Sequence, residues 1–165
     1  MHTRSGENPA EKTFQKTNSS LSLPDTKVMK HITVVAGIVW NKGRFLAAKR
    51  PEGKPFAGFW EFPGGKIEPG ESADHALVRE FAEEMNVTPT AWEYWREVRH
   101  EYPELTVTLH FFHITDYSGD LHPLEGHEIG WFTHAQAMSM PFLEADIAIV
   151  DDLQHVQYAA QAQEA

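Results

Sequence analysis

Gly65-Lys-Ile-Glu-Pro-Gly-Glu71, followed after seven residues by Arg79-Glu80-Phe-Ala-Glu83-Glu84, is the most informative stretch of this 165-residue sequence. Ala, Leu, Arg and Glu dominate residues 72–85, a composition that predicts a helix. Ser72 has the side chain of an N-cap, and Asn86 tolerates the left-handed conformation with which helices often end. The stretch therefore predicts a loop followed by one well-delimited helix.

Three carboxylates share one face of this predicted helix. Helical residues advance by about 100° each, so Glu80, Glu83 and Glu84 fall within an arc of roughly 100°. Such carboxylates repel one another, and only Arg79 and Lys66 are near in sequence to offset the repulsion. Hard oxygen ligands at close quarters are what Mg²⁺ or Mn²⁺ prefers, and these metals usually share their coordination shell with substrate phosphates.

The flanking residues agree with a site of this kind. Glu71 adds a fourth carboxylate in the loop, and Gly64-Gly65 allows close approach of the backbone, as phosphate-handling loops often need. An apolar arc would anchor the helix to a core, formed by Leu77, Val78, Phe81, Ala82 and Met85. The alternative is an amphipathic helix with a solvated acidic face. Spacing alone does not exclude it, because Glu83 points away from the apolar arc.

The complete pattern resembles the Nudix box. Its spaced identities are Gly65, five residues, Glu71, seven residues, Arg79-Glu80-Phe81, one residue, Glu83-Glu84, two residues and Val87. A chance match of six spaced identities with correctly placed apolar residues is improbable. One position departs, because the family's usual glycine after the glutamate pair is Asn86 here, and Asn replaces Gly well in a left-handed turn.

The resemblance implies a fold and a metal centre. The fold would be the α+β Nudix fold, an α/β/α sandwich with a mixed β-sheet, in which the box forms a loop-helix-loop. By family analogy, Mg²⁺ (or Mn²⁺) would be bound by Glu80, Glu83 and Glu84 and by the backbone carbonyl of Gly65. Arg79 would orient the glutamates, and Gly64 and Glu71 would have supporting roles.

The resemblance extends beyond the box, from about His31 to Leu153. Phe59-Trp-Glu-Phe-Pro-Gly-Gly-Lys-Ile-Glu-Pro-Gly-Glu71 is similar to the MutT branch and to the related CTP pyrophosphohydrolases. It implies a further metal-binding and catalytic glutamate at Glu125, which has the family's spacing to Trp131. The substrate would contact four further residues: Arg50 at the phosphates, Phe62 and Asp146 at the base, and Lys66. Each of these assignments has a simpler alternative. Arg50 could be a surface arginine, Glu125 a solvated loop glutamate and Phe62 a core aromatic residue. Asp146 could be the N-cap of a helix.

The function implied is hydrolysis of a nucleoside triphosphate to a nucleoside monophosphate and pyrophosphate. In the MutT branch this is 8-oxo-dGTP diphosphatase activity, a sanitation of the nucleotide pool that supports DNA repair. A CTP or 5-modified-CTP pyrophosphohydrolase is the alternative, since Asp146 would accept hydrogen bonds from the exocyclic amine of either base. A non-catalytic nucleotide-sensing module is a third interpretation, but such modules typically lose box glutamates, and all of them are present here.

The composition of the chain limits the kinds of partner and the cellular location that we expect. With 14 Lys+Arg against 24 Asp+Glu, the net charge is −10, and no basic cluster appears that could neutralise a polynucleotide backbone. A small nucleotide that arrives with its metal is compatible with this charge, although acidity also serves solubility alone. No cysteine is present, and no apolar run reaches the roughly eighteen residues of a membrane helix. We therefore expect a cytoplasmic enzyme, monomeric or homodimeric.

The rest of the chain predicts alternating strands and helices. Residues 1–28 read as a flexible extension, 29–158 as the Nudix domain and 159–165 as a tail. Strands are predicted over 32–40, 44–50, 59–62, 92–99, 106–115 and 129–132, and a last helix over 146–157. Thr133 and Gln136 have capping-box spacing. Of the histidines, His110 and His113 should point to opposite faces of a strand, and His127 to solvent.

Overall fold

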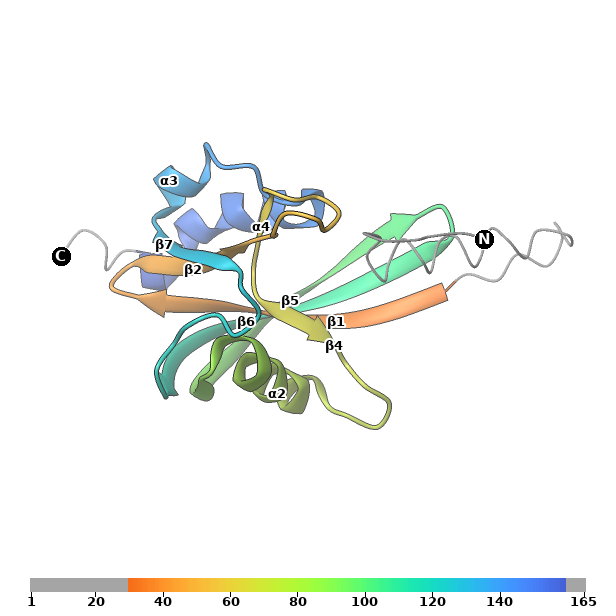
Figure 1. Ribbon diagram of the computed structural model, residues 1–165, viewed down its shortest axis with the longest axis horizontal. Coiled ribbons are helices and arrows are strands. Elements are labelled where there is room, and N and C mark those ends of the chain that lie inside the picture. Colours follow the sequence, from red (N-terminus) through yellow and green to blue (C-terminus); the bar gives the residue numbers. More distant parts are fainter. Residues whose placement is uncertain (1–29, 160–165) are drawn as a thin grey trace, which may run out of the picture.

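The fold comes from a computed structural model, and the structure describes residues 30–159 (Figure 1). Its strands are β1 (Lys30–Asn41), β2 (Arg44–Lys49), β3 (Trp60–Glu61), β4 (Gly64–Lys66), β5 (Thr88–Tyr102), β6 (Leu105–Ser118) and β7 (Glu128–Phe132). The helices are α2 (Ala73–Met85), α3 (His134–Ala137), α4 (Glu144–Asp152) and the 3-10 helix η2 (Leu153–His155). Within residues 30–159, no helix has the length and apolar character needed to cross a membrane.

Strand β1 is the centre of a mixed sheet. The order is β3-β2-β1-β6-β5, with β4 also paired to β1 and β7 to β2. Strand β1 runs parallel to β6 and antiparallel to β4, which it meets at Val34–Ala36. The hairpin β5–β6 is the longest antiparallel pair, and its far end extends beyond the helices (Figure 1). The predicted α+β fold with a mixed sheet is therefore confirmed.

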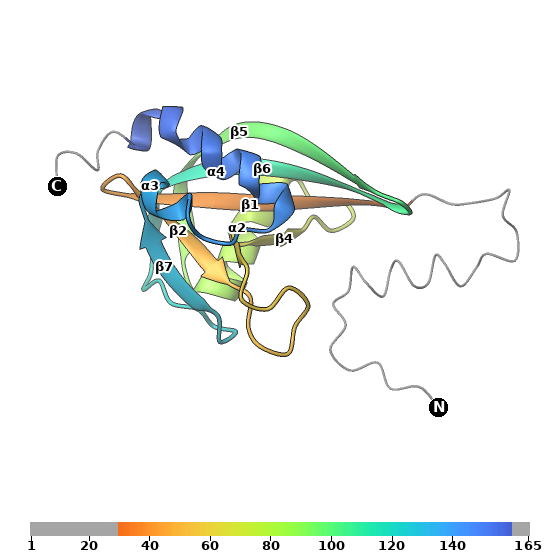
Figure 2. The ribbon, with the colours of Figure 1, turned by 90° about the horizontal axis from the view of Figure 1, so that it is seen from above.

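Helices cover both faces of this sheet, and each covered face has its own core. Alternate residues of β1 supply the two cores, with Ile38 in one and Val39 in the other. The first core packs against α4, where Ile149 is buried, and the second packs against α2, where Phe81 is buried. Figure 2 shows α4 lying across β5, β6 and β1, on the face opposite α2. This arrangement is the predicted sandwich.

The predicted helix caps and the predicted faces of one strand are confirmed. The side chain of Ser72 accepts a hydrogen bond from the His75 backbone at 3.1 Å, and Asn86 ends α2 with φ of 61°. Thr133 and Gln136 form both hydrogen bonds of the capping box. The faces of β6 are also as predicted, because His113 contacts Trp40 in one core whereas His110 contacts Tyr94 on the other face.

Other predictions need correction. Helix α4 begins two residues earlier than expected and ends at Asp152, after which the chain tightens into η2. Strands β5 and β6 are longer than predicted, because each pairs with the other beyond the apolar segments that identified them. Residues 64–66, expected to end a strand, form β4 instead, because β1 offers free backbone groups beside them. The predicted extension, residues 1–28, lies outside the described residues.

Candidate active site

Arg79 organises the carboxylates of the loop and of α2. Its guanidinium donates to both oxygens of Glu71, from Nε at 2.7 Å and from an Nη at 2.9 Å. It also donates to Glu80 at 3.4 Å, to Glu83 at 3.2 Å and to the backbone carbonyl of Lys66 at 3.0 Å. The Arg79 hydrogen bond holds the pKa of Glu71 down at about 2, and Glu71 in turn accepts from the backbone of the loop. One arginine therefore joins the loop, the helix and β4.

Glu80 lies against the backbone of β4. A Cβ placed on Gly65 would collide with the Glu80 carboxylate, so only glycine leaves room for that side chain there. Burial raises the pKa of Glu80, and the negative charges of Glu83 and Glu125 add to the rise, while Arg79 opposes it. Because residue 65 is glycine, the partly buried Glu80 carboxylate can lie next to the backbone of β4.

Glu84 is the most strongly perturbed carboxylate of the helix. Burial raises its pKa to about 8, and repulsion from Glu80, Glu125 and Glu61 contributes to the rise. A hydrogen bond from the backbone N–H of Gly64 acts in the opposite direction and is too weak to cancel it. The α2 carboxylates therefore lie close enough to destabilise one another's charged form.

These carboxylates fit a hard divalent cation. Among residues 30–159, no three acidic or histidine side chains converge closely enough to enclose an ion, since Glu83 is turned toward Arg79 and Glu125 is exposed. Burial nevertheless disfavours the charged forms of Glu80 and Glu84, and repulsion from neighbouring carboxylates adds to the effect, so a bound cation would favour these charged forms. The donors are all oxygens, which is the preference of Mg²⁺ or Mn²⁺.

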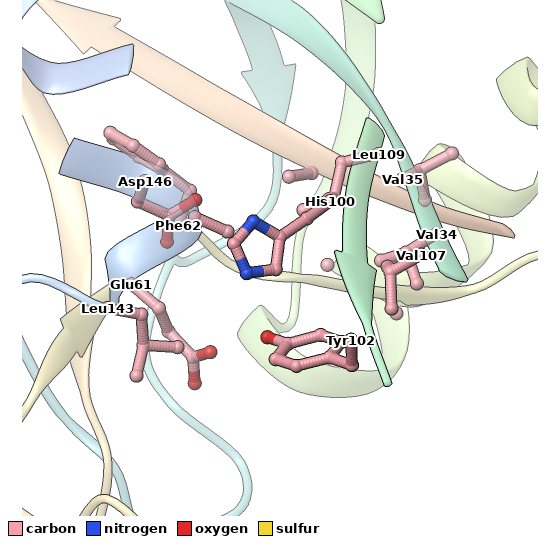
Figure 3. A pocket seen from close by; sticks show the side chains of 14 residues that line it. Val34, Val35, Glu61, Phe62, His100, Tyr102, Val107, Leu109, Leu143 and Asp146 are labelled. Carbon is pink, nitrogen blue, oxygen red and sulfur yellow. The ribbon is translucent and has the colours of Figure 1, made fainter. Parts of the chain in front are cut away.

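A cavity of about 290 Å³ opens beside β4 on the α4 face of the sheet (Figure 3). Phe62 and Asp146 line it, and its border includes Gly64 and Gly65. Phe62 is buried and packs on Phe111 and Phe142 of the core, so its ring is held rigidly. The cavity therefore meets the glutamate helix at the glycine pair.

Asp146 is a buried acid rather than a helix cap. Helix α4 begins at Glu144, its N-cap is Leu143, and no side chain caps it. Asp146 is 5% exposed, and burial raises the pKa of its carboxyl to about 8, with repulsion from Glu61 adding to the rise. A hydrogen bond from the Phe62 backbone opposes this rise. The capping alternative is therefore wrong, because the helix starts two residues before the aspartate.

A second, polar cavity of about 190 Å³ shares Glu61, Phe62 and Gly64 with the first and reaches Glu84. Arg50 lines it, donates to Glu61 at 3.2 Å and is held by the Pro55 carbonyl at 2.8 Å. His127 also lines this cavity, and its Nδ1 is buried and has no hydrogen-bond partner among the described residues. The prediction that His127 faces solvent is wrong, because its side chain is half-buried where it lines this cavity.

The structure thus gathers most of the predicted site residues but not all of them. Lys66 is exposed, lines neither cavity, and joins the network only through its carbonyl. Sequence reasoning missed Glu61, and it also missed His100 and Tyr102 of β5, which line the larger cavity. Their alternation along β5 was the available signal, but a strand has two faces and nothing local tells which one meets a cavity.

A helix of paired carboxylates beside a cavity is compatible with a metal-assisted hydrolase of phosphate compounds. The model of the NUDIX domain matches residues 29–153. The chain belongs to the Nudix family.

Known relatives agree with this assignment. The chain is 37% identical over 134 residues to the CTP pyrophosphohydrolase of Escherichia coli, covering 81% of this chain and 99% of that protein. It is 36% identical over 98 residues to the 8-oxo-dGTP diphosphatase of Proteus vulgaris, covering 59% of this chain and 88% of that protein. Among solved structures, the E. coli ORF135 protein has a TM-score of 0.70 and 38% identity, covering 79% and 94%. A MutT structure from Aliivibrio salmonicida or Vibrio cholerae has a TM-score of 0.66 and 36% identity, covering 80% of this chain and 99% of that one.

Proposed function

We propose that this protein is a pyrophosphohydrolase that converts a nucleoside triphosphate to a nucleoside monophosphate and pyrophosphate, with an oxidised purine nucleotide such as 8-oxo-dGTP as the first candidate substrate. The main support is the continuity between the cavity of Phe62 and Asp146 and the glutamate helix at Gly64-Gly65. At about 290 Å³ the cavity is at the small end of ligand sites, so it suits a base and part of the sugar. The phosphates would then lie over the glycine pair.

Each side chain would have one task in this reaction. Mg²⁺ or Mn²⁺, held by the Gly65 carbonyl and Glu80, Glu83, Glu84 and Glu125, would neutralise charge on the phosphates and favour ionisation of the attacking water. Arg79 would keep the glutamates in place through the hydrogen bonds described above. Arg50, which lines the polar cavity beside Glu84, would bind a phosphate oxygen. No nucleophilic side chain of the protein is required, so stabilisation of developing charge would carry the rate.

A CTP or 5-modified-CTP substrate is the second candidate. The E. coli relative that this chain matches over 99% of that protein's length is named CTP pyrophosphohydrolase. Asp146 supports either base, because guanine and cytosine both carry an exocyclic amine that can donate to a carboxyl oxygen. Uracil and thymine have none, so both candidates predict poor use of UTP and dTTP.

The proposal is tested by pyrophosphate release from a panel of canonical and damaged nucleotides with Mg²⁺. EDTA should abolish release, and added Mg²⁺ or Mn²⁺ should restore it. Glu83→Gln should lower kcat by on the order of a hundredfold, as loss of charge stabilisation does. Glu97→Gln, at an exposed glutamate of β5, is the matched control and should be neutral. Full turnover in excess EDTA would overturn the proposed mechanism.

Base recognition by Asp146 is tested by comparing kcat/KM for 8-oxo-dGTP, 5-methyl-CTP and dTTP. A buried polar group left unpaired by the wrong base costs about 1–3 kcal/mol, so the wild type should discriminate by tenfold or more. Asp146→Ala should flatten this ranking and keep the metal requirement. An unchanged ranking in Asp146→Ala would mean that the base is recognised elsewhere.

A further inference from the structure

The distal half of the β5–β6 hairpin supplies a wall of the larger cavity. His100 is paired in register with Val107, and Tyr102 with Leu105, so both β5 side chains lie on the α4 face of the hairpin. Neither residue belongs to the Nudix box. Figure 3 shows His100 in the middle of the cavity and Tyr102 beside it, across from Glu61 and Leu143.

These two rings contact each other, and Tyr102 is 37% exposed. Their centroids are 4.6 Å apart and their planes are inclined by 72°, which is the favourable edge-to-face arrangement of aromatic rings. Val107 and Leu109 of β6 add apolar side chains to the lining of the same cavity. The wall is therefore apolar and aromatic, whereas the acidic groups of the cavity come from α4 and β3.

The acidic side of the cavity faces this wall. Asp146 comes from α4 and Glu61 from β3, and both line the same cavity as Tyr102. Burial raises the pKa of the Tyr102 hydroxyl, and the charges of Glu144 and Asp146 contribute, so the hydroxyl is near the start of α4. A flat ligand between the two sides would have a ring face against the aromatic pair and hydrogen-bond donors toward the acids.

We propose that His100 and Tyr102 are specificity-determining residues, forming a wall on which the nucleobase stacks and which favours purines over pyrimidines. This inference rests on the proposed function, because it names the base class for the same site. Stacking on an aromatic side chain is worth about five- to a hundredfold in affinity per base, and a two-ring purine covers more of the wall than a one-ring pyrimidine. The acids recognise the amine of the base, and the wall recognises its size.

The test uses the full chain in EDTA with two nucleosides, deoxyguanosine and deoxycytidine, titrated and followed by NMR chemical shifts. Nucleosides carry no phosphate, so binding reports the base cavity without the metal centre. Tyr102→Ala should weaken deoxyguanosine binding about tenfold and deoxycytidine binding about threefold. Tyr102→Phe, which keeps the ring, should stay within twofold, and Tyr102→Leu, which keeps apolar area without a ring, should resemble the alanine variant.

The hairpin offers a matched control on its other face. Tyr94 and His110 form a comparable tyrosine–histidine pair, with ring centroids 5.8 Å apart, and Tyr94 packs on Phe112 of the core under α2. Tyr94→Ala removes the same ring from the same strand without touching the cavity. It should leave both nucleoside affinities unchanged, so a general loosening of the hairpin is distinguished from loss of the wall.

Activity gives a second measurement that separates the two proposals. In Tyr102→Ala, the ratio of kcat/KM for dGTP over dCTP should fall by about threefold, with pyrophosphate still released. Three results would overturn the proposed role of the wall. They are equal losses for both nucleosides in Tyr102→Ala, equal effects of Tyr94→Ala and Tyr102→Ala, and no deoxyguanosine binding by the wild type. If nucleosides bind as expected but the wild type releases no pyrophosphate, the wall stands and the proposed hydrolysis fails.

Discussion

Replacing His113 by glutamine should remove part of the acid sensitivity of folding. His113 is 3% exposed, and its Nδ1 accepts a hydrogen bond from the Trp40 indole at 2.9 Å. Because an indole N–H only donates, the imidazole must be neutral, with its proton on Nε2. That nitrogen is buried and without a partner among the described residues. A second proton would face the indole N–H in a site with little solvation.

The magnitude follows from the pKa of His113. Burial lowers it from 6.5 to about 4, with Arg96 assisting and Glu93 opposing. The unfolded chain therefore binds this proton near pH 6.5, whereas the folded protein binds it only near pH 4. The associated stability is fully present above pH 6.5, is lost as pH falls toward 4, and changes no further below that. At 1.36 kcal/mol for each pH unit, the loss is about 3 kcal/mol.

The assay is urea denaturation of wild type and His113→Gln between pH 8 and pH 4, followed by tryptophan fluorescence. Glutamine has an acceptor oxygen for Trp40 and cannot titrate. At pH 8 it should be the less stable protein by about 1–2 kcal/mol through imperfect packing. Toward pH 4 the wild type should lose about 3 kcal/mol relative to His113→Gln, so that the variant becomes the more stable protein. Other titrating groups, such as Glu84 and Asp146, are common to both proteins and cancel in the difference.

His110→Gln on the same strand is the control. Its ring is partly exposed on the opposite face, where it bonds Tyr94, so this variant replaces a histidine of β6 without altering the Trp40 contact. Parallel pH curves for wild type and His113→Gln would refute the reasoning. They would mean that His113 is protonated in the folded protein or that the folded state admits water to Nε2.

The remaining predictions concern the glycine pair and the N-terminal segment. Gly65→Ala should cost about a hundredfold in kcat with little change in melting temperature, because the added methyl displaces the flexible end of Glu80. Gly64→Ala should instead lower the melting temperature by several degrees, because its methyl would meet the backbone of Val35, which cannot move aside without breaking β1–β4 pairing. If Gly64→Ala and Gly65→Ala changed kcat and melting temperature equally, the separate roles of the two glycines would be contradicted. A chain that begins at Lys27 should keep its melting temperature and kcat/KM, and a tenfold loss of activity would assign the removed residues a role.

Local sequence predicted helix α2 well because its signals are local. Ser72, Asn86 and the apolar arc act within one or two turns of the backbone, so their effects do not depend on the rest of the chain. The contact of Arg79 with Glu83, four residues on, follows from the same helical spacing. The family's spacing then allowed the carboxylate helix to be interpreted as a metal site.

The start of α4 was misjudged because its signal is not local. Asp146 has the side chain of an N-cap, but it is buried against β3, and the helix begins at Glu144 without a capping side chain. Burial of Asp146 depends on Phe62, more than eighty residues earlier in the chain. A propensity for capping cannot compete with a contact of that kind, which no window of sequence contains.

The sequence by itself determined the carboxylate helix, the strand pattern and the family, because these depend on the order of residues within short segments. Only the tertiary structure decided which face of the β5–β6 hairpin lines the cavity, so His100 and Tyr102 became candidates and Tyr94 did not. It also placed His127 and Glu84 in the lining of one cavity and left Lys66 outside both cavities. The physical reason is that a cavity is bounded by several elements at once, and their relative placement is set by packing of both cores rather than by any one segment.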